Sequence, residues 1–399
     1  MSWVLPAGLY VSTPATSVAG APTRRAFCGM PRLSLCCCLK RHDGVLLSGQ
    51  IGVQPLATLQ VNHRLLMPKA LPFPSVALGL TLLLAACEPA LQSAAPSSQH
   101  VADAFVSQVV LPEYEQLAAR SGRLASALDA LATDPDPAYL EAARTAWQQV
   151  RAIWEKGESW AFGPAETAGF DHHLDGWPVN EKDLSAALAS GSVTPDLFAK
   201  LTTTAKGFHG IEAVLYGTGD ARPEASQLGA AQRAYLRQAG ADLAANAKGL
   251  LAAWSGPRGF GTAFKANGDE AVAEILQGMV GTLEEVAAEK LGAPLKSRSK
   301  EDLESFYSDN TSADIVSNVA GVREALQRSG LLAWIRSRDR QLASALDQAL
   351  NEASASAQAL PSGLNATLDD AAGRQRIQAV ISSSDRSVAL LKRAAALVS

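Results

Sequence analysis

Cysteine is scarce in this sequence and confined to its first quarter. The five cysteines are Cys28, Cys36–Cys38 and Cys87, and the early ones lack the paired Cys-x-x-Cys spacing of metal sites. The chain after Cys87 therefore cannot form an internal disulfide. Its stability must come from a buried hydrophobic core, which a chain of 399 residues can build as one or two domains.

Histidine and basic residues are also limited. The chain has six histidines, with no His-Glu-x-x-His motif of zinc peptidases and no Cys-x-x-Cys-His motif of attached haem. Lys and Arg number 35 against 39 Asp and Glu, for a formal net charge of −4. This balance argues against nucleic acid as a partner, because binding to phosphates depends on excess basic charge.

Strand-forming patterns are almost absent as well, whereas Ala, Leu, Gln, Glu and Arg are frequent from residue 101 onward. This composition favours helices. We expect helices at 101–132, 137–160, 195–216, 226–254, 268–291, 312–328, 331–358 and 366–397. Long helices with short connections predict an all-α fold of packed four-helix-type bundles. A Gly- and Pro-containing segment at 254–261 predicts a division into an N-terminal bundle, 101–255, and a C-terminal bundle, 256–399.

A signal-like pattern precedes the helical region. Met67–Lys69 leads into an apolar stretch at 76–86, which ends in small residues before Cys87. A charged start, an apolar run of about 7–15 residues and small residues at the cut are typical of a secretory signal. A transmembrane helix is the alternative, but the longer stretch from Leu71 to Ala86 contains Pro72 and Pro74 and falls short of the roughly 20 residues needed to span a bilayer. The pattern resembles a bacterial lipoprotein signal, with Cys87 as the lipidated residue.

This interpretation divides the first hundred residues. Residues 1–66 are expected to be a non-native extension, 67–86 the signal peptide and 87–100 a flexible tether rich in Pro, Ser and Ala. We expect a periplasmic protein anchored to a membrane by its lipid. Glu88 is not the aspartate associated with inner-membrane retention, which slightly favours the outer membrane.

The most informative motif is a histidine and a glutamate three positions apart in a helix. His209 and Glu212 share one helix face, so an imidazole nitrogen and a carboxylate oxygen can approach one metal ion. The alternative is a hydrogen-bonded pair on a helix surface. Because Thr194–Pro195 is a helix start and Gly217 a helix end, we expect the pair in the last turns of the helix 195–216.

Two further segments contain candidate ligands. In the helix 137–160, Arg151 and Glu155 are an i,i+4 pair that predicts a surface ion pair, and Glu158 is a carboxylate among aromatic residues. In the segment 171–178, which we expect to be a loop, His172 and His173 are weaker candidates. Asp175 there is either a ligand or a turn former.

Four ordered motifs together resemble the imelysin family of bacterial periplasmic proteins. They are Gly207 with His209 and Glu212, and the segments 158–164, 175–178 and 304–311. The resemblance spans most of residues 101–399. It implies two packed four-helix bundles, with the Gly-x-His-x-x-Glu residues near their interface.

The resemblance also implies a role in iron uptake. It makes His209 and Glu212 the expected metal ligands, with Glu158 and Asp175 as weaker companions and iron as the expected metal. A transporter is then an expected partner. Two alternatives stay open: a zinc-dependent metallopeptidase of the imelysin type, which needs about three protein ligands and a carboxylate base, and a non-enzymatic interaction lipoprotein in which the pair braces two bundles.

Overall fold

The structure is a computed structural model that describes residues 95–219 and 221–398. Helices and no strands occur in this part of the chain, which confirms the all-α fold. The residues 1–66, the signal peptide and Cys87 lie outside it. Of the predicted tether 87–100, residues 87–94 also lie outside the described residues, and residues from Ser98 onward belong to the first helix. Among the described helices, none has both the length and the apolar character needed to cross a membrane.

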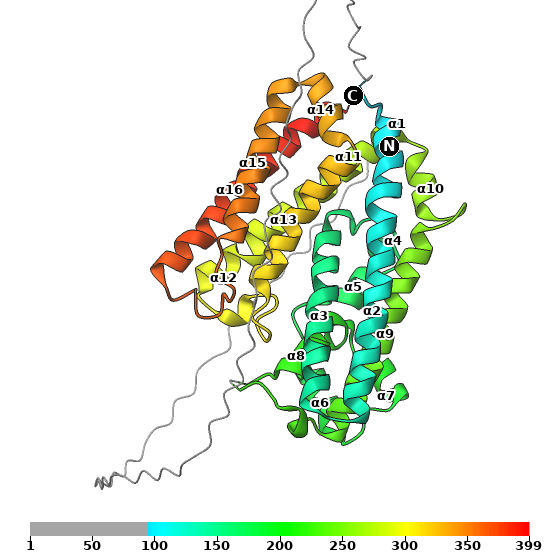
Figure 1. The fold of residues 1–399 in the computed structure, drawn as a ribbon, viewed down its shortest axis with the longest axis vertical. Coiled ribbons are helices and arrows are strands. Elements are labelled where there is room, and N and C mark those ends of the chain that lie inside the picture. The colour runs from blue at the N-terminus through cyan, green and yellow to red at the C-terminus, as the bar shows by residue number, and fades with distance from the viewer. Residues whose placement is uncertain (1–94, 220, 399) are drawn as a thin grey trace, which may run out of the picture. The chain divides into compact units, whose positions relative to one another are not determined.

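The first group of helices extends to residue 265. Its elements are α1 Ser98–Ala104, η1 Phe105–Val110, α2 Leu111–Thr133, α3 Pro137–Gly157, η2 Glu158–Trp160, α4 Pro164–Thr167, α5 Phe170–Asp175, α6 Glu181–Ala189, α7 Pro195–Ala199, η3 Thr203–Ala205, α8 Gly207–Tyr216, η4 Ala225–Gln227, α9 Ala230–Trp254 and α10 Phe260–Lys265. Helix α2 packs between α3 and α9 (Figure 1). The shorter α8 also contacts both α3 and α9. These four helices enclose one part of the core.

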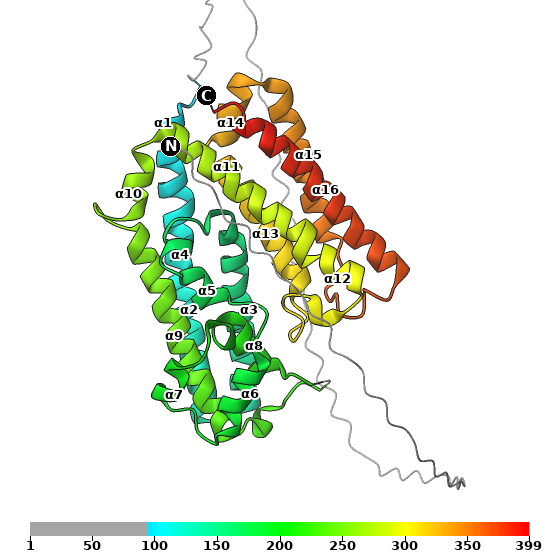
Figure 2. The ribbon, with the colours of Figure 1, turned by 180° about the vertical axis from the view of Figure 1, so that it is seen from behind.

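The second group follows α10. Its elements are α11 Gly268–Glu285, η5 Val286–Lys290, α12 Gly292–Ser297, η6 Lys300–Asp302, α13 Thr311–Arg328, α14 Leu331–Arg338, α15 Arg340–Gln358 and α16 Ala371–Ala395. Helices α11, α13, α15 and α16 pack in a ring, with α15 and α16 side by side in both views (Figures 1 and 2). Helix α13 packs against α3 of the first group. The residues discussed below lie along this contact.

Aromatic residues join the two sides of the predicted boundary at 254–261. The rings of Trp254 and Phe260 are 4.8 Å apart, and the ring of Phe264 stacks on that of Phe162 at 5.6 Å. The short helix α10 thus packs on residues that precede the boundary. The division into 101–255 and 256–399 stays a prediction.

One predicted helix is broken at the candidate motif. Thr194 caps a helix as expected, since its hydroxyl accepts a hydrogen bond from the Leu197 amide, but this helix is only α7. The range 195–216 contains α7, η3 and α8, because Lys206 is extended and Gly207 has a φ of +58°. His209 and Glu212 therefore lie in the first turns of α8. The helix ends at Gly217 and the pair lies within its last two to three turns, as predicted, but the prediction of one long helix over 195–216 is wrong.

Two other boundaries differ from the expected ones. The range 331–358 splits into α14 and α15 at Asp339, whose side chain caps α15 by accepting a hydrogen bond from the Leu342 amide. The segment 171–178 is only partly a loop, since its first half belongs to α5. At Asp339 a helix cap divides one expected helix into two, and at Gly176 a helix ends inside an expected loop. Composition alone indicates neither boundary.

Candidate metal centre

Gly207 determines where the motif helix begins. A Cβ atom at this position would lie 2.4 Å from the backbone oxygen of Leu174, and the positive φ also disfavours other residues. Only glycine thus allows α8 to begin directly against the end of α5. Asp175 follows Leu174 in α5, so this close contact brings the Asp175 carboxylate beside His209.

His209 is fully buried among three carboxylates. Its Nε2 atom lies 3.1 Å from Asp175 Oδ1 and 3.7 Å from Glu304 Oε1, and its Nδ1 atom lies 3.0 Å from Glu212 Oε2. The Nε2 atom nevertheless makes no hydrogen bond of ordinary geometry. A buried ring nitrogen without an aligned partner between two carboxylates has the surroundings of a metal ligand.

Glu212 uses both of its carboxylate oxygens. Its Oε1 atom accepts hydrogen bonds from the Ser308 amide, at 2.8 Å, and from the Ser308 hydroxyl, at 2.7 Å, while Oε2 faces His209. When one imidazole nitrogen binds a metal, a carboxylate that accepts a hydrogen bond from the other nitrogen fixes the orientation and tautomer of the ring. The role of Glu212 as a direct ligand stays a prediction.

Arg151 is buried, so the prediction of a surface ion pair with Glu155 is wrong. Both side chains are fully inaccessible to solvent, and Arg151 contacts the carboxylates of Glu155 and Asp175. It also donates a hydrogen bond of 2.9 Å to Glu304 Oε1. Trp154 adds a hydrogen bond of 2.6 Å from its Nε1 atom to Asp175 Oδ2. A charge buried in this way is retained only because several partners surround it.

Lys290 enters the same cluster from the second group of helices. Its Nζ atom lies 2.8 Å from Glu155 Oε2, 2.9 Å from Glu158 Oε2 and 2.8 Å from Glu304 Oε2. Asn318 on α13 donates from Nδ2 to Glu155 Oε2 and Glu158 Oε2. The end of α3 and the beginning of η2 are thereby joined to η5 and α13.

The pKa of His209 reflects these surroundings. Burial and the charge of Arg151 lower it, but the carboxylates of Asp175, Glu212 and Glu304 outweigh them and raise the pKa well above its ordinary value. These carboxylates therefore favour the protonated form of the imidazole. A metal ion that binds Nε2 must displace this proton.

The carboxylates of the centre differ in their pKa values. Burial raises the pKa of Glu304, but Lys290 and Arg151 outweigh burial and hold it well below its usual range. Burial and the charge of Glu155 raise the pKa of Asp314 to about 8, and the same two causes raise the pKa of Glu158 well above its usual range. Burial and Glu155 therefore favour the protonated forms of Asp314 and Glu158, whereas Lys290 and Arg151 favour the ionised form of Glu304.

Carboxyl groups outnumber basic groups here, and the raised pKa values of Glu158 and Asp314 mean that bound protons neutralise part of the excess. The positive groups are Arg151, Lys290 and protonated His209; the carboxylates are Glu155, Glu158, Asp175, Glu212, Glu304 and Asp314. Buried charge is costly unless it is neutralised. A metal cation could take the place of these protons, and the carboxylate and imidazole groups present fit such an ion.

Two sets of side chains in the described part of the chain could hold an ion. Asp175, His209 and Glu304 form what we call the histidine group, and Glu155, Glu158, Asp175 and Glu304 form the lysine group, named for its contact with Lys290. In each group the ligand atoms lie within 4.8 Å of one another. Imidazole with carboxylate suits iron, zinc or manganese.

The predicted site residues are thus distributed over both groups. His209 and Asp175 meet in the histidine group, Glu158 belongs to the lysine group, and Glu212 contacts His209 without joining either. The weaker candidates His172 and His173 belong to neither group, and the side chain of His172 is 79% exposed. His172 instead lines the cleft that leads to the centre.

Three important residues were missed. Glu304 lies in the segment 304–311 that resembles the imelysin family, yet no local spacing marks it as a ligand. Lys290 is the last residue of a π-helical turn, η5, and Asn318 lies inside α13. Each reaches the centre only because α11–η5 and α13 pack against α3 and η2, and this contact is not encoded by local sequence periodicity.

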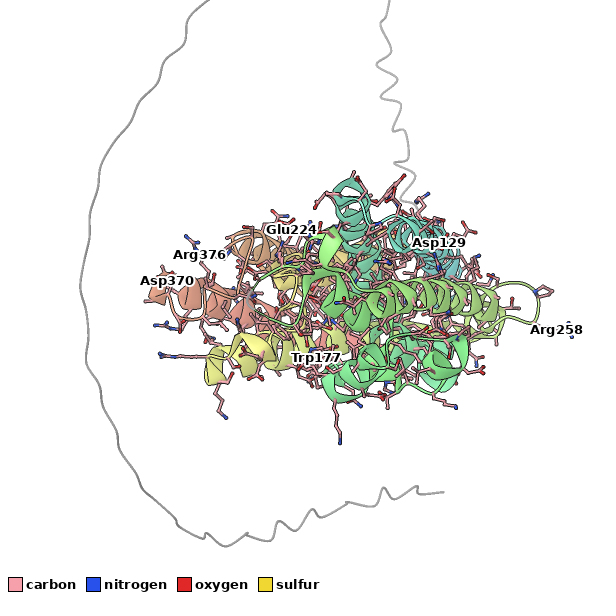
Figure 3. The ribbon with its side chains drawn as sticks, turned by 90° about the horizontal axis from the view of Figure 1, so that it is seen from below. Asp129, Trp177, Glu224, Arg258, Asp370 and Arg376 are labelled. Atoms are coloured by element: carbon pink, nitrogen blue, oxygen red, sulfur yellow. The ribbon has the colours of Figure 1, made fainter. Side chains whose placement is uncertain are left out.

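An open cleft of about 680 Å³ reaches the centre from solvent. Its lining includes Glu158, Glu166, Asp171, Asp175, Glu274, Glu285, Glu289 and Glu304, with His172 and no lysine or arginine. Trp177, which is 38% exposed, contributes an aromatic wall and lies where the green and yellow ribbons meet (Figure 3). A cleft of one charge sign raises the local concentration of ions of the opposite sign.

Comparisons with known proteins identify relatives of this chain. Residues 110–391 match the sequence profile of the imelysin family. Iron-regulated protein A of Synechococcus elongatus is 34% identical over 255 residues, which cover 61% of this chain and 67% of that protein.

Two solved structures share the fold. An iron-regulated protein A precursor from Parabacteroides distasonis has a TM-score of 0.71 at 21% identity, covering 77% of this chain and 97% of that one. An imelysin-like protein from Psychrobacter arcticum has a TM-score of 0.63 at 20% identity, covering 74% and 94%. The profile match extends over more than half of the sequence and includes His209, Glu212 and Glu304. The chain therefore belongs to the imelysin family.

Proposed function

We propose that this protein binds an iron cation in the periplasm and serves iron uptake while anchored to a membrane by lipid. The observation that carries the proposal is the histidine group. Asp175, His209 and Glu304 come from three separate segments and converge within 4.8 Å in a buried, negatively charged place. Such convergence is costly without a cation to balance it.

Each residue has a distinct part in this proposal. Asp175 and Glu304 supply carboxylate oxygens and His209 supplies Nε2, while Glu212 orients the imidazole through Nδ1. The acidic cleft concentrates cations at the entrance, so that capture from dilute solution is favoured.

The biological setting rests on other observations. The lipoprotein-like signal ending at Cys87 supports the periplasmic location and the lipid anchor, and Glu88 slightly favours the outer membrane. The names of the relatives in Synechococcus elongatus and Parabacteroides distasonis connect those proteins with iron regulation. Transfer of the ion to an iron transporter is part of the same proposal.

Metal titration of the purified protein tests the metal site. We expect tight Fe(II) or Fe(III) binding by the wild-type protein and its loss in His209→Ala and in Glu304→Gln, with circular dichroism unchanged. His100→Ala is the matched control, because His100 is exposed on α1 and belongs to neither group. Folded wild-type protein that binds no iron would refute the proposal.

A zinc peptidase is the second candidate, since the histidine group offers the three protein ligands that catalytic zinc needs. The neighbouring Glu158 is held by Lys290 and Asn318, so it is not free to act as the general base. Zinc-loaded protein incubated with unfolded protein substrates distinguishes the two. Hydrolysis that disappears in His209→Ala would favour the peptidase.

A further inference from the structure

The lysine group already contains a cation, the ammonium of Lys290. The Nζ atom lies between 2.8 and 3.0 Å from oxygens of Glu155, Glu158 and Glu304. Only 3% of Lys290 is exposed, so the ammonium has exchanged water for carboxylate oxygens. The ammonium of lysine carries a compact charge that water hydrates strongly in solution. Its burial is therefore costly unless several carboxylates replace the lost water, as the three glutamates do here.

The backbone fixes the ammonium at this place. Helix α11 changes into the π-helical turn η5, Val286–Lys290, at whose last residue the side chain reaches the carboxylates. Single π-helical turns in proteins often occur at functional sites. Asn318 holds Glu155 and Glu158 from the other side through Nδ2, and its own Oδ1 atom is buried without a hydrogen-bond partner.

Glu304 connects the two groups through its separate oxygens. Its Oε1 atom lies 2.9 Å from an Arg151 nitrogen and 3.7 Å from His209 Nε2, while its Oε2 atom lies 2.8 Å from Lys290 Nζ. One carboxylate thus faces the proposed metal position with one oxygen and the ammonium with the other. A carboxylate between two cations is the arrangement found in two-metal sites, where the ions are about 3.5–4 Å apart.

We propose that Lys290 is a tethered cation that holds the second cation position and limits the centre to one metal ion. The inference rests on the proposed metal binding by the histidine group. Without the ammonium, the lysine group keeps four carboxylates whose ligand atoms lie within 4.8 Å of one another. Oxygen ligands in that number suit a divalent cation such as Mn(II) or Fe(II).

Counting bound ions in variants of the full chain tests the inference. Equilibrium dialysis with Fe(II) under anaerobic conditions, repeated with Mn(II), should give one ion per chain for the wild type and two for Lys290→Met. Adding Glu158→Gln to Lys290→Met should return the count to one. Lys296→Met is the matched control, since Lys296 is exposed on α12, and it should keep one ion.

Other variants keep the test decisive. Lys290→Arg preserves the positive charge, so this variant should bind one ion. Lys290→Gln replaces the charged side chain by a neutral polar one, so this variant should bind two ions. If Lys290→Met does not fold without metal, the count for folded Lys290→Gln decides. One ion in every folded variant that lacks a cation at position 290 would overturn the inference.

The two proposals fail in different ways. In the Lys290→Met background, His209→Ala should remove one of the two ions and leave the one that depends on Glu158. If the wild type binds none and Lys290→Met binds one that Glu158→Gln removes, the histidine group is not a metal site, yet Lys290 still excludes a cation. If the wild type binds one and Lys290→Met also binds one, the metal site stands and the role of Lys290 falls.

Discussion

Arg151 and Arg386 form similar ion pairs in very different surroundings. Arg151 is fully buried and contacts Glu155, Asp175 and Glu304, whereas Arg386 on α16 is 58% exposed and contacts Glu352, itself 40% exposed, on α15. At the surface, water replaces either partner at little cost. In the interior, removal of one partner leaves unpaired charge in a medium that solvates it poorly. Identical pairing chemistry therefore has different consequences for stability and function.

Removal of Arg151 should have the largest effect. Arg151→Met leaves the carboxylates of Glu155, Asp175 and Glu304 without their common partner, so we expect a loss of about 3–5 kcal/mol in the free energy of unfolding. Urea denaturation followed by circular dichroism measures it. A loss below about 1 kcal/mol would show that protonation of the carboxylates compensates fully.

Glu212→Gln tests the orienting contact at the other side of His209. We expect iron affinity to fall about 10- to 100-fold, the range for partners that orient a metal-bound histidine. Calorimetric titration measures the affinity, with Glu352→Gln on the surface as the control. Unchanged affinity would remove Glu212 from the site, and a loss as large as that of His209→Ala would make it a direct ligand.

Asp171 lies between the two extremes, at the edge of the acidic cleft. Burial and the charge of Asp175 raise the pKa of Asp171 to about 6, above its ordinary value of 3.8. The ionised carboxylate therefore destabilises the folded state, a penalty that grows as pH rises from about 4 and is complete above about 6.

Asp171→Asn should remove this penalty. Because the side chain is 42% exposed, solvent screening limits the gain at pH 8 to about 1 kcal/mol or less, with little change at pH 4. Urea denaturation at both pH values provides the measurement. An equal effect at the two pH values would contradict the electrostatic cause.

Removal of Arg386 should have the smallest effect. Arg386→Ala breaks an exposed pair, so we expect a change below about 0.5 kcal/mol that decreases further at high salt. Thermal unfolding at two salt concentrations measures it beside the wild type. A loss comparable to that of Arg151→Met would mean that exposure does not distinguish the two pairs.

Much of the fold could be predicted from local patterns. The apolar residues Trp147, Val150 and Trp154 are buried on one face of α3, as their spacing requires. The start of α7 at Thr194 was also correct. These features depend on contacts between residues a few positions apart, so the spacing of residue types in the sequence is enough to predict them.

The centre was only partly predictable, because some of its residues come together through contacts between distant parts of the sequence. His209 was found because Glu212 lies three positions away on the same helix, and Asp175 because it stands near histidines and aromatic residues. Glu304 and Lys290 contact α3 and η2 across more than 130 residues of sequence. The helical periodicity of the sequence reflects only contacts between residues a few positions apart. It therefore could not identify Glu304 or Lys290 as part of the site.

The sequence by itself determined the helical class, the apolar helix faces and the pairing of His209 with Glu212, because each arises from interactions within a few turns of helix. Tertiary structure decided that α8 begins at Gly207, that Arg151 is buried and that Glu304 and Lys290 complete the centre. The reason is that burial and the electrostatic balance of a charged group depend on all its neighbours, most of which are distant in sequence.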